Sequence, residues 1–273
     1  MRIEVADLHF TYPGEIHALR GISMVIDSGE IVAIVGQNGS GKTTLVKHFN
    51  GLLQPGNGTV RIEDWDTRDH TVAQLAARVG YVFQNPDEQL FRSSVKKEIA
   101  FGPNNLGYSP EKVQTLVENT IRLTDLVDFV DHNPYDLSPT WRKIVALASV
   151  IAMDTPIVII DEPTTGQDAL RVAQIARIVS ELHARGKTLI TISHDIDFCA
   201  ENFDRIIALS QGEILLDGPV LEILAHDEML RRTYVDLPQL TRLGNELGLP
   251  RTVRNQDDFL KLYCQMRDRT HLQ

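Results

Sequence analysis

The chain contains 273 residues, of which 42% are hydrophobic and 23% are charged, and its formal net charge is −10. This length suits one large domain, or one domain with a small appendage. The composition excludes disordered, collagenous and low-complexity classes, and the acidic charge argues against nucleic acid as a partner.

The cysteines and the apolar runs indicate the cellular compartment. Cys199 and Cys264 are too few for a disulfide framework and belong to no paired-cysteine metal motif, which favours a reducing compartment. The longest mainly apolar run, residues 145–153, is too short to cross a bilayer. Residues 1–5 lack the basic and then apolar order of a signal peptide. We therefore expect a cytoplasmic chain that reaches a membrane only through a partner.

The predicted elements begin with antiparallel strands. Over the first thirty residues apolar and polar side chains alternate, which is typical of half-buried strands. The continuous apolar run 31–35 predicts a strand covered on both faces, and a helix over 44–50 that Gly51 closes follows it. Further strands are predicted at 59–62, 79–83, 157–160, 188–192 and 206–209. Further helices are predicted at 72–78, 94–101, 111–124, 141–153, 169–185, 197–202 and 221–225.

The alternation of strands and helices predicts an α/β fold, with a mixed sheet core and an antiparallel N-terminal β part. The mostly helical stretch 94–153 is expected to form a subdomain. Beyond residue 226 we expect a small C-terminal extension, 226–273, made of short helical pieces. The breaks between these pieces are expected at Pro238, Gly244, Gly248 and Pro250.

A phosphate-binding loop lies between the strand at 31–35 and the helix after it. Every defined position of the phosphate-loop pattern is matched by Gly36, Gln37, Asn38, Gly39, Ser40, Gly41, Lys42 and Thr43. The glycines let backbone N–H groups surround an anion, and the helix N-terminus adds positive potential. Lys42 is expected to supply a cation for the β- and γ-phosphates of a nucleotide, the Thr43 hydroxyl to join the Mg²⁺ shell, and Thr44 also to contact the nucleotide. An ordinary glycine-rich turn is the alternative, and the loop alone does not distinguish kinase, GTPase, motor and transporter ATPase.

Two acids follow the strand predicted at 157–160. An acid at a strand end beside a phosphate loop commonly holds Mg²⁺, and Asp161 is the candidate. Glu162 is expected to orient a water for attack on the γ-phosphate. A solvated strand end is the alternative, and the Pro-Thr-Thr-Gly sequence that follows argues against it. His194 also follows a predicted strand, where an imidazole can touch the γ-phosphate and the attacking water.

Five motifs in this order resemble the ATP-binding cassette of ABC transporters. They are residues 36–43, 82–84, 137–138, 161–168 and 193–195. The resemblance covers residues 1–225 and implies a two-lobed cassette that dimerises head to tail. ATP is then held between the phosphate loop of one subunit and the signature motif of the other.

The same resemblance implies roles for four further residues. Tyr12 would lie against the adenine ring, although packing on the core is the alternative for a tyrosine in a strand. Gln84 would sense Mg²⁺ and pass the nucleotide state to the helical lobe, so it counts as both a catalytic and a metal-site residue. Ser138 of the signature would contact the partner's nucleotide, and Asp168 would lie in the loop that crosses the dimer interface.

A narrower resemblance is to energy-coupling factor importers, which take up vitamins and transition metals such as cobalt and nickel. It rests on residues 84–91, 100–103, 105–107 and 237–243. It implies a related partner ATPase, with a heterodimer favoured and a homodimer possible, an integral membrane scaffold, and a separate membrane protein that captures the substrate. The chain is then expected at the cytoplasmic face of the cell membrane as a peripheral subunit.

The stretch from Gln84 to Phe101 is the predicted docking segment for the membrane scaffold. Leu90 and Phe91 are apolar residues in an otherwise polar loop, and we expect both to be exposed anchors of an interface. A plain surface loop before a helix is the alternative.

The signature departs from the family pattern Leu-Ser-Gly-Gly-Gln. Pro139, Thr140 and Trp141 replace the two glycines and the glutamine. Glycine lets backbone N–H groups approach the γ-phosphate, whereas proline has no N–H to donate. A tolerated variant is one interpretation. We favour the other, in which the site completed by this motif is slow or silent.

Other function classes stand beside an ATPase subunit of a membrane importer. They are the ATPase of a general ABC importer, a soluble ABC ATPase outside transport, and a small-molecule P-loop kinase. The lack of a long coiled-coil insertion and the single phosphate loop argue against the soluble class. A kinase would have no use for the loop at 162–168. The transported substrate is not encoded here, because a different polypeptide selects it.

Overall fold

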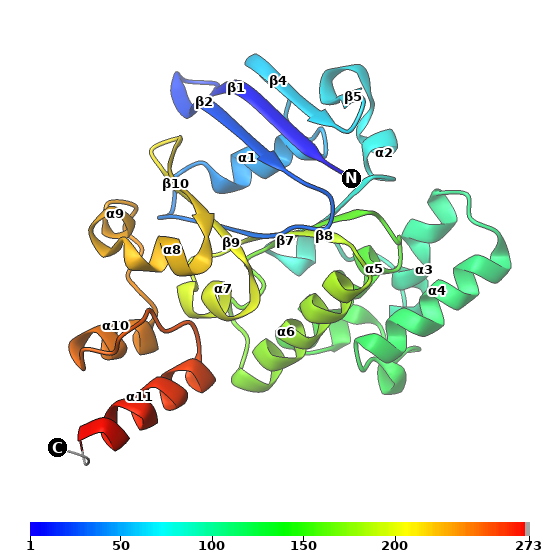
Figure 1. The fold of residues 1–273 in the computed structure, drawn as a ribbon. Helices are drawn as coiled ribbons and strands as arrows, with labels where there is room; N and C mark the ends of the chain where they lie inside the picture. The colour runs from blue at the N-terminus through cyan, green and yellow to red at the C-terminus, as the bar shows by residue number, and fades with distance from the viewer. Residues whose placement is uncertain (271–273) are drawn as a thin grey trace.

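A computed structural model describes residues 1–270, which fold around two β-sheets (Figure 1). The central sheet has the strand order β10-β9-β3-β8-β7-β6. Its strands are β3 Ile31–Val35, β6 Val79–Val82, β7 Ile157–Asp161, β8 Thr188–Ile192, β9 Arg205–Ser210 and β10 Glu213–Pro219. All are parallel except β10, which pairs antiparallel with β9. This mixed sheet confirms the predicted α/β class.

The second sheet is antiparallel and has the order β2-β1-β4-β5. Its strands are β1 Ile3–Tyr12, β2 Ile16–Ile26, β4 Asn57–Ile62 and β5 Trp65–Asp66. Helix α1 (Lys42–Phe49) lies between the two sheets (Figure 1), and its Leu45 and Phe49 enter the apolar cluster that both sheets share. The expected antiparallel N-terminal part is therefore present.

The continuous apolar strands are explained by burial on both faces of the central sheet. Successive side chains of a strand point to opposite faces. In β3, Val32 and Ile34 pack in the cluster with the antiparallel sheet, while Ala33 and Val35 pack in the cluster with the helices on the other side. Both faces of the strand therefore need apolar residues.

Helices cover the side of the central sheet that faces away from the antiparallel sheet. α3, α4 and α5 form the predicted helical region, and α6 and α7 lie beside it (Figure 1). The helix bounds are α2 Val72–Leu75, α3 Val95–Asn105, α4 Pro110–Leu123, α5 Pro139–Ile151, α6 Ala169–Ala184 and α7 Ile196–Asn202. Short 3₁₀ turns lie at Thr67–Asp69, Pro86–Glu88, Val127–Phe129 and Pro134–Asp136.

The C-terminal helices lie together on one side of the molecule, in orange and red in Figure 1. They are α8 Val220–Ala225, α9 Asp227–Arg231, α10 Gln239–Glu246 and α11 Gln256–Thr270. The expectation of short pieces is wrong for α11, which has 15 residues, and Gly244 lies inside α10 and does not break it. The guanidinium of Arg254 donates to the carbonyl oxygens of Ala200 and Phe203, both at 2.6 Å, and so anchors this part near α7. The domain boundary at residue 225 remains a prediction.

No helix within residues 1–270 combines the length and the apolar character that a bilayer span requires.

Candidate active site

The phosphate loop joins the end of β3 to the start of α1, and two of its glycines are required by the backbone. Gly36 has φ +146°, and a Cβ there would lie 2.2 Å from the carbonyl oxygen of Leu209. Gly41 has φ +105°, and a Cβ there would lie 2.7 Å from the carbonyl oxygen of Ala18. Gly41 is also the cap residue directly before α1. The loop therefore ends where the unpaired N–H groups of the first helical turn begin.

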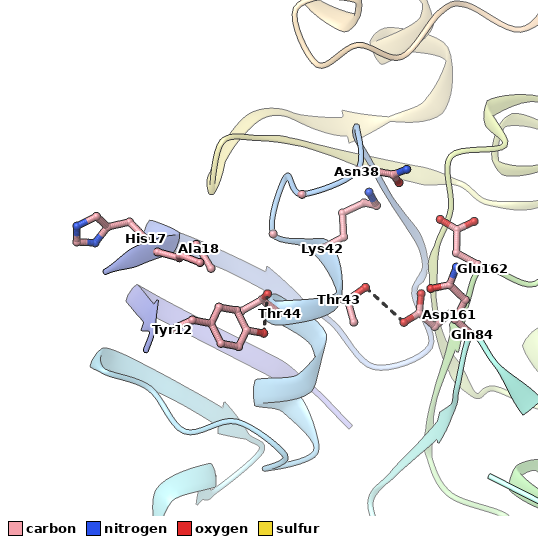
Figure 2. Close-up of a pocket in the computed structure, with 13 residues that line it drawn as sticks. Tyr12, His17, Ala18, Asn38, Lys42, Thr43, Thr44, Gln84, Asp161 and Glu162 are labelled. Atoms are coloured by element: carbon pink, nitrogen blue, oxygen red, sulfur yellow. Dashed lines mark hydrogen bonds between the residues drawn. The ribbon is translucent and has the colours of Figure 1, made fainter. Parts of the chain in front are cut away.

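A cavity of about 290 Å³ opens beside this loop. Figure 2 shows three groups of side chains around it, from α1 and its loop, from the β1–β2 hairpin, and from the ends of β6 and β7. Among the predicted site residues, the cavity brings together Tyr12, Asn38, Gly39, Gly41, Lys42, Thr43, Thr44, Gln84, Asp161 and Glu162.

Lys42 is folded back onto its own loop. Its ammonium donates to the carbonyl oxygens of Gly36 at 2.7 Å and Gln37 at 2.9 Å. Burial lowers the pKa of Lys42, while the carboxylates of Glu162 and Asp161 act in the opposite direction. Both carbonyl acceptors are neutral. A phosphate oxygen is the stronger acceptor for an ammonium, so it would draw this side chain into the cavity.

Asp161 ends β7 with a buried carboxylate. Its Oδ2 accepts hydrogen bonds from the Tyr81 hydroxyl at 2.6 Å and, more weakly, from the Thr43 hydroxyl at 3.4 Å. Its Oδ1 is buried and has no hydrogen-bond partner among the described residues. Burial raises the pKa of Asp161, and the hydrogen bond from Tyr81 opposes that rise. An unpaired carboxylate oxygen beside a hydroxyl at the cavity wall fits Mg²⁺, which prefers hard oxygen ligands and retains several waters.

Glu162 is oriented from three sides. Its backbone is left-handed, with φ +50°, and its N–H donates to the carbonyl oxygen of Ile192 at 2.8 Å. Its Oε2 accepts from Nδ1 of His194 at 2.7 Å and from the Thr165 hydroxyl at 3.2 Å. Because a carboxylate only accepts, Nδ1 of His194 carries the proton in this contact. Glu162 lines the cavity, and His194, which does not line it, holds the Glu162 carboxylate through Nδ1.

Tyr12 and Gln84 lie on opposite sides of the cavity (Figure 2). The Tyr12 hydroxyl is 3.2 Å from the Thr44 hydroxyl, and its ring packs edge-on against Phe10. Tyr12 therefore both packs on a neighbouring ring and faces the cavity. Gln84 lies next to Asp161 and Glu162, two residues after the end of β6.

Some predicted site residues do not line this cavity: Gly36, Gln37, Ser40, Ser138, Asp168 and His194. Ser138 and Asp168 cap helices, which explains their local conformation. The Ser138 hydroxyl accepts the N–H of Trp141 at the start of α5, and the Asp168 carboxylate accepts the N–H of Arg171 at the start of α6. Their roles at a dimer interface remain predictions.

The structure adds five residues to this chain's own site. Ile16, His17 and Ala18 line the cavity at the start of β2, because the hairpin brings them beside Tyr12. Tyr81 bonds to Asp161, and Lys143 bonds to the backbone of Glu162. The sequence signal for Lys143 is a cation that directly precedes the apolar stretch of α5.

The predicted docking segment, residues 84–101, is bonded to α5. The side-chain amide of Gln89 donates to the carbonyl oxygen of Ala146 at 2.7 Å. The guanidinium of Arg142 pairs with the Asp87 carboxylate at 2.8 Å. The segment therefore connects the cavity, which it borders through Gln84, to the helix that begins with the signature residues.

Only one of the two apolar residues expected to be exposed in this segment is exposed. The Phe91 side chain is 57% exposed and packs edge-on against Phe101. The expectation for Leu90 is wrong, since Leu90 is 2% exposed and belongs to the core. The Tyr135 hydroxyl donates to the Leu90 carbonyl at 2.7 Å. In this loop one of the two adjacent apolar side chains is buried and the other is exposed. The spacing of apolar residues in the sequence does not tell which of the two is buried.

Together, a phosphate loop, two acids at a neighbouring strand end and a helical region on a mixed sheet define a P-loop nucleotide hydrolase of the cassette type. The comparisons with known proteins agree. The ABC transporter family matches residues 19–165. The energy-coupling factor transporter ATP-binding protein EcfA of Methanothermobacter thermautotrophicus is 39% identical over 249 residues, which cover 90% of this chain and 80% of the relative.

Two solved structures share the fold. The structure of cbiO1 from Clostridium perfringens, part of the ABC transporter complex cbiONQ, has a TM-score of 0.76 at 33% identity and covers 90% of this chain and 98% of that one. The dimeric ATP-binding cassette MJ0796, bound to ADP and Pi in a post-hydrolysis state, has a TM-score of 0.73 at 27% identity, with 80% and 98% covered. The chain therefore belongs to the ABC transporter family and is an ABC-type ATP hydrolase.

Proposed function

We propose that the cavity binds ATP with Mg²⁺ and that Glu162 activates the water that attacks the γ-phosphate. The observation that carries this proposal is the Glu162 carboxylate, which lines the cavity opposite the phosphate loop and is held by His194 at 2.7 Å. The carboxylate accepts a proton as the water oxygen bonds to the γ-phosphorus. The bond to the bridging oxygen then breaks, and ADP and phosphate are released.

The phosphate loop binds the triphosphate in this proposal. The loop amides and the start of α1 provide donors, and Lys42 exchanges its carbonyl partners for the β- and γ-phosphates. Tyr12 contacts the adenine ring from the hairpin side. Mg²⁺ would be held by Thr43 and Asp161, with Gln84 nearby, and when bound it neutralises charge that develops on the phosphates.

The dimer completes the site. The cavity of one chain contains neither Ser138 nor Asp168, and both lie at the start of helices, where the helix dipole favours a negatively charged group. In a head-to-tail dimer these residues would lie against the partner's nucleotide. We favour a heterodimer with a related ATPase, because the signature of this chain lacks its glycines, and a homodimer is the alternative.

The dimer would drive a membrane importer of the energy-coupling factor type from the cytoplasmic face of the membrane, where it is peripheral. The likeness to EcfA and to cbiO1 supports this assignment. The membrane scaffold would dock on residues 84–101, where Phe91 is exposed beside Phe101. A separate membrane protein would capture the substrate, a vitamin or a transition-metal ion.

Co-expression with the membrane scaffold and the partner ATPase tests this function. We expect the chain to copurify with an integral membrane protein and to support ATP-dependent uptake in vesicles. Lys42→Ala is the matched control and should assemble without transport, because its ATP affinity falls by roughly 10–150-fold for a lost charge-assisted bond of about 1.5–3 kcal/mol. Failure to associate with any membrane subunit would reject the importer assignment. If the same preparation hydrolysed ATP, the assignment as an ATP hydrolase would still stand.

A further inference from the structure

Lys143 is a buried lysine whose role the site does not yet explain. It lies in the second turn of α5, and the residue is 5% exposed. Lysine is rarely buried unless its ammonium has a partner. Burial lowers the pKa of Lys143, and the carboxylates of Glu162 and Asp161 oppose that change. The negative charges of both acids therefore favour the charged form of Lys143.

The partner of Lys143 is the backbone of Glu162. The ammonium donates to the Glu162 carbonyl oxygen, at the residue whose φ is +50°. A glutamate in the left-handed region is held there by its surroundings. On the other side, the Glu162 N–H donates to Ile192. The peptide groups on both sides of the Glu162 Cα are thus fixed, one by a strand and one by Lys143.

The direction of the Glu162 side chain depends on this backbone. Left-handed and extended conformations at one residue send its side chain in different directions, so the bonds that fix φ and ψ also aim the carboxylate. His194 and Thr165 hold the carboxylate tip, whereas Lys143 holds the main chain at its root. A positive charge behind the two carboxylates also reduces their mutual repulsion before Mg²⁺ and ATP arrive.

We propose that Lys143 is a positioning residue for hydrolysis: by holding the Glu162 carbonyl, it aims the Glu162 carboxylate at the attacking water. This inference rests on the proposed function, in which Glu162 activates that water. Lys143 does not line the cavity, so its loss should affect the rate of hydrolysis and not the binding of ATP. If Lys143 only filled space in the core, an apolar side chain of similar size at this position would leave the rate of hydrolysis unchanged.

The test compares Lys143→Met with the native chain, assembled with the partner ATPase and the membrane subunit. Methionine keeps the length of the side chain and removes the donor and the charge. We expect kcat to fall at least tenfold while KM for ATP and equilibrium ATP binding stay within threefold. Lys143→Gln, which restores a neutral donor, should recover part of kcat.

Lys187→Met is the matched control. Lys187 is a half-buried lysine that also donates to a backbone carbonyl, that of Asp154 at 2.9 Å, and it lies outside the cavity lining. This variant should keep kcat within twofold of the native value.

A double-mutant cycle separates positioning from general destabilisation. If Lys143 acts through Glu162, then Lys143→Met should cause little further loss in a Glu162→Gln background. Independent, multiplying losses, or a native kcat for Lys143→Met, would overturn the inference. Near-native hydrolysis by Glu162→Gln alone would instead reject the proposed role of Glu162, so the two failures are distinguishable. If Lys143→Met does not assemble, Lys143→Gln carries the same cycle.

Discussion

Glu162 has the least favourable backbone conformation in the site. A left-handed residue that is not glycine costs about 1–2 kcal/mol, and at φ +50° Glu162 is held by bonds to Ile192 and Lys143. Conformations that the surroundings enforce in this way cluster at functional positions. The geometry therefore marks Glu162, among the two adjacent acids, as the residue whose direction matters.

Glu162→Gln should leave ATP binding intact and lower hydrolysis by roughly 10²–10⁴-fold, the contribution of a typical general base. The amide keeps the size of the side chain and an acceptor oxygen for His194, but it cannot take up a proton. Phosphate release by the assembled complex and equilibrium nucleotide binding measure the two effects. Glu181→Gln, in an exposed ion pair with Arg185, is the control. Near-normal hydrolysis by Glu162→Gln would reject the general-base role.

His48, on α1, gives a prediction about pH. Its ring is buried, and its Nδ1–H donates to the carbonyl oxygen of Thr44 at 2.8 Å, while Nε2 has no partner among the described residues. Burial lowers the pKa of His48 from its ordinary 6.5, against an opposing effect of nearby backbone carbonyls. Protonation at Nε2 would leave a buried N–H without an acceptor, which is costly.

The sign of the effect follows from proton linkage. As the pH falls below 6.5, His48 in the unfolded chain binds a proton before the folded chain does. The free energy of unfolding therefore decreases toward acid pH, and above 6.5 this contribution is constant. In denaturant titrations, the free energy of unfolding of His48→Gln should fall less between about pH 7.5 and about pH 5.5 than that of the native chain. Curves parallel to those of the native chain would contradict this, and exposed His226→Gln is the control.

At the scale of elements, tertiary packing moved boundaries that the residue pattern suggested. The helix predicted at 94–101 is longer in the structure, where α3 continues through Pro103 to Asn105. Proline lacks the N–H that would bond one turn back, so local preference disfavours this extension. Gly102, however, packs closely on Met153, where a Cβ would lie 2.4 Å from Cγ. Contact with Met153, which follows the end of α5, therefore outweighs this local preference.

The strand β10 was not predicted, because its side chains give no clear strand pattern. Its residues Glu213–Pro219 are mostly half-exposed and do not alternate cleanly between polar and apolar. The strand lies at the edge of the central sheet and pairs only with β9. Edge strands tolerate polar residues and a terminal proline. Such a strand is defined by backbone pairing, which side-chain patterning does not report.

The docking segment gives a prediction at the same scale. Phe91→Glu should uncouple transport from ATP binding, because a charge at an exposed aromatic anchor disrupts an apolar contact. Phe91 is 57% exposed, so the change should cost the isolated chain less than about 1 kcal/mol of unfolding free energy. Copurification with the scaffold and vesicle uptake measure the loss, beside nucleotide binding.

The matched control is Val127→Glu. Val127 is 58% exposed and lies on the same helical region, outside residues 84–101. It should assemble and transport like the native chain. Normal assembly and transport by Phe91→Glu would show that the segment does not dock the scaffold through this residue.

For the whole molecule, the signature residues lead to a prediction about the two sites of a dimer. Ser138 caps α5 and Pro139 is its first residue. Proline fits this position because the N–H there has no partner within the helix, but it removes a donor from the helix end that would face a phosphate. Trp141 packs on Phe129 and under Arg171 of its own chain. These residues stabilise the local fold, and we expect them to bind a phosphate less well than a glycine-containing signature would.

We therefore predict an asymmetric heterodimer. A partner with a glycine-containing signature would complete the site built on Lys42 and Glu162 of this chain, whereas the partner's own phosphate loop would face Pro139 and Trp141. Most ATP hydrolysis should then occur at this chain's site. The measurement disables the catalytic glutamate of each subunit in turn and compares phosphate release by the two complexes.

Two outcomes would contradict this asymmetry. One is equal loss of activity from Glu162→Gln and from the matching change in the partner. The other is rapid hydrolysis by a homodimer of this chain, in which both sites would face the degenerate signature. Loss of most activity through Glu162, with a mild effect from the partner's glutamate, is the expected result.

The sequence by itself determined the order of most strands and helices up to residue 225, β10 excepted, and the places of the phosphate loop and of the two acids that follow the apolar residues of β7. These features depend on residues that are close along the chain: the period of apolar residues, glycines at a turn, and a cap before a helix. The position of Lys42 in the cavity could therefore be predicted from spacing alone.

Only the tertiary structure decided which groups form hydrogen bonds with Asp161 and Glu162. It also decided which of Leu90 and Phe91 is exposed. The bond from Tyr81 to Asp161 joins residues 80 positions apart, and that from Lys143 to Glu162 spans 19 positions. Leu90 is buried because neighbours from distant elements enclose it. Such contacts depend on the strand order of the central sheet and on the packing of α5 against it. No local period or spacing carries that information.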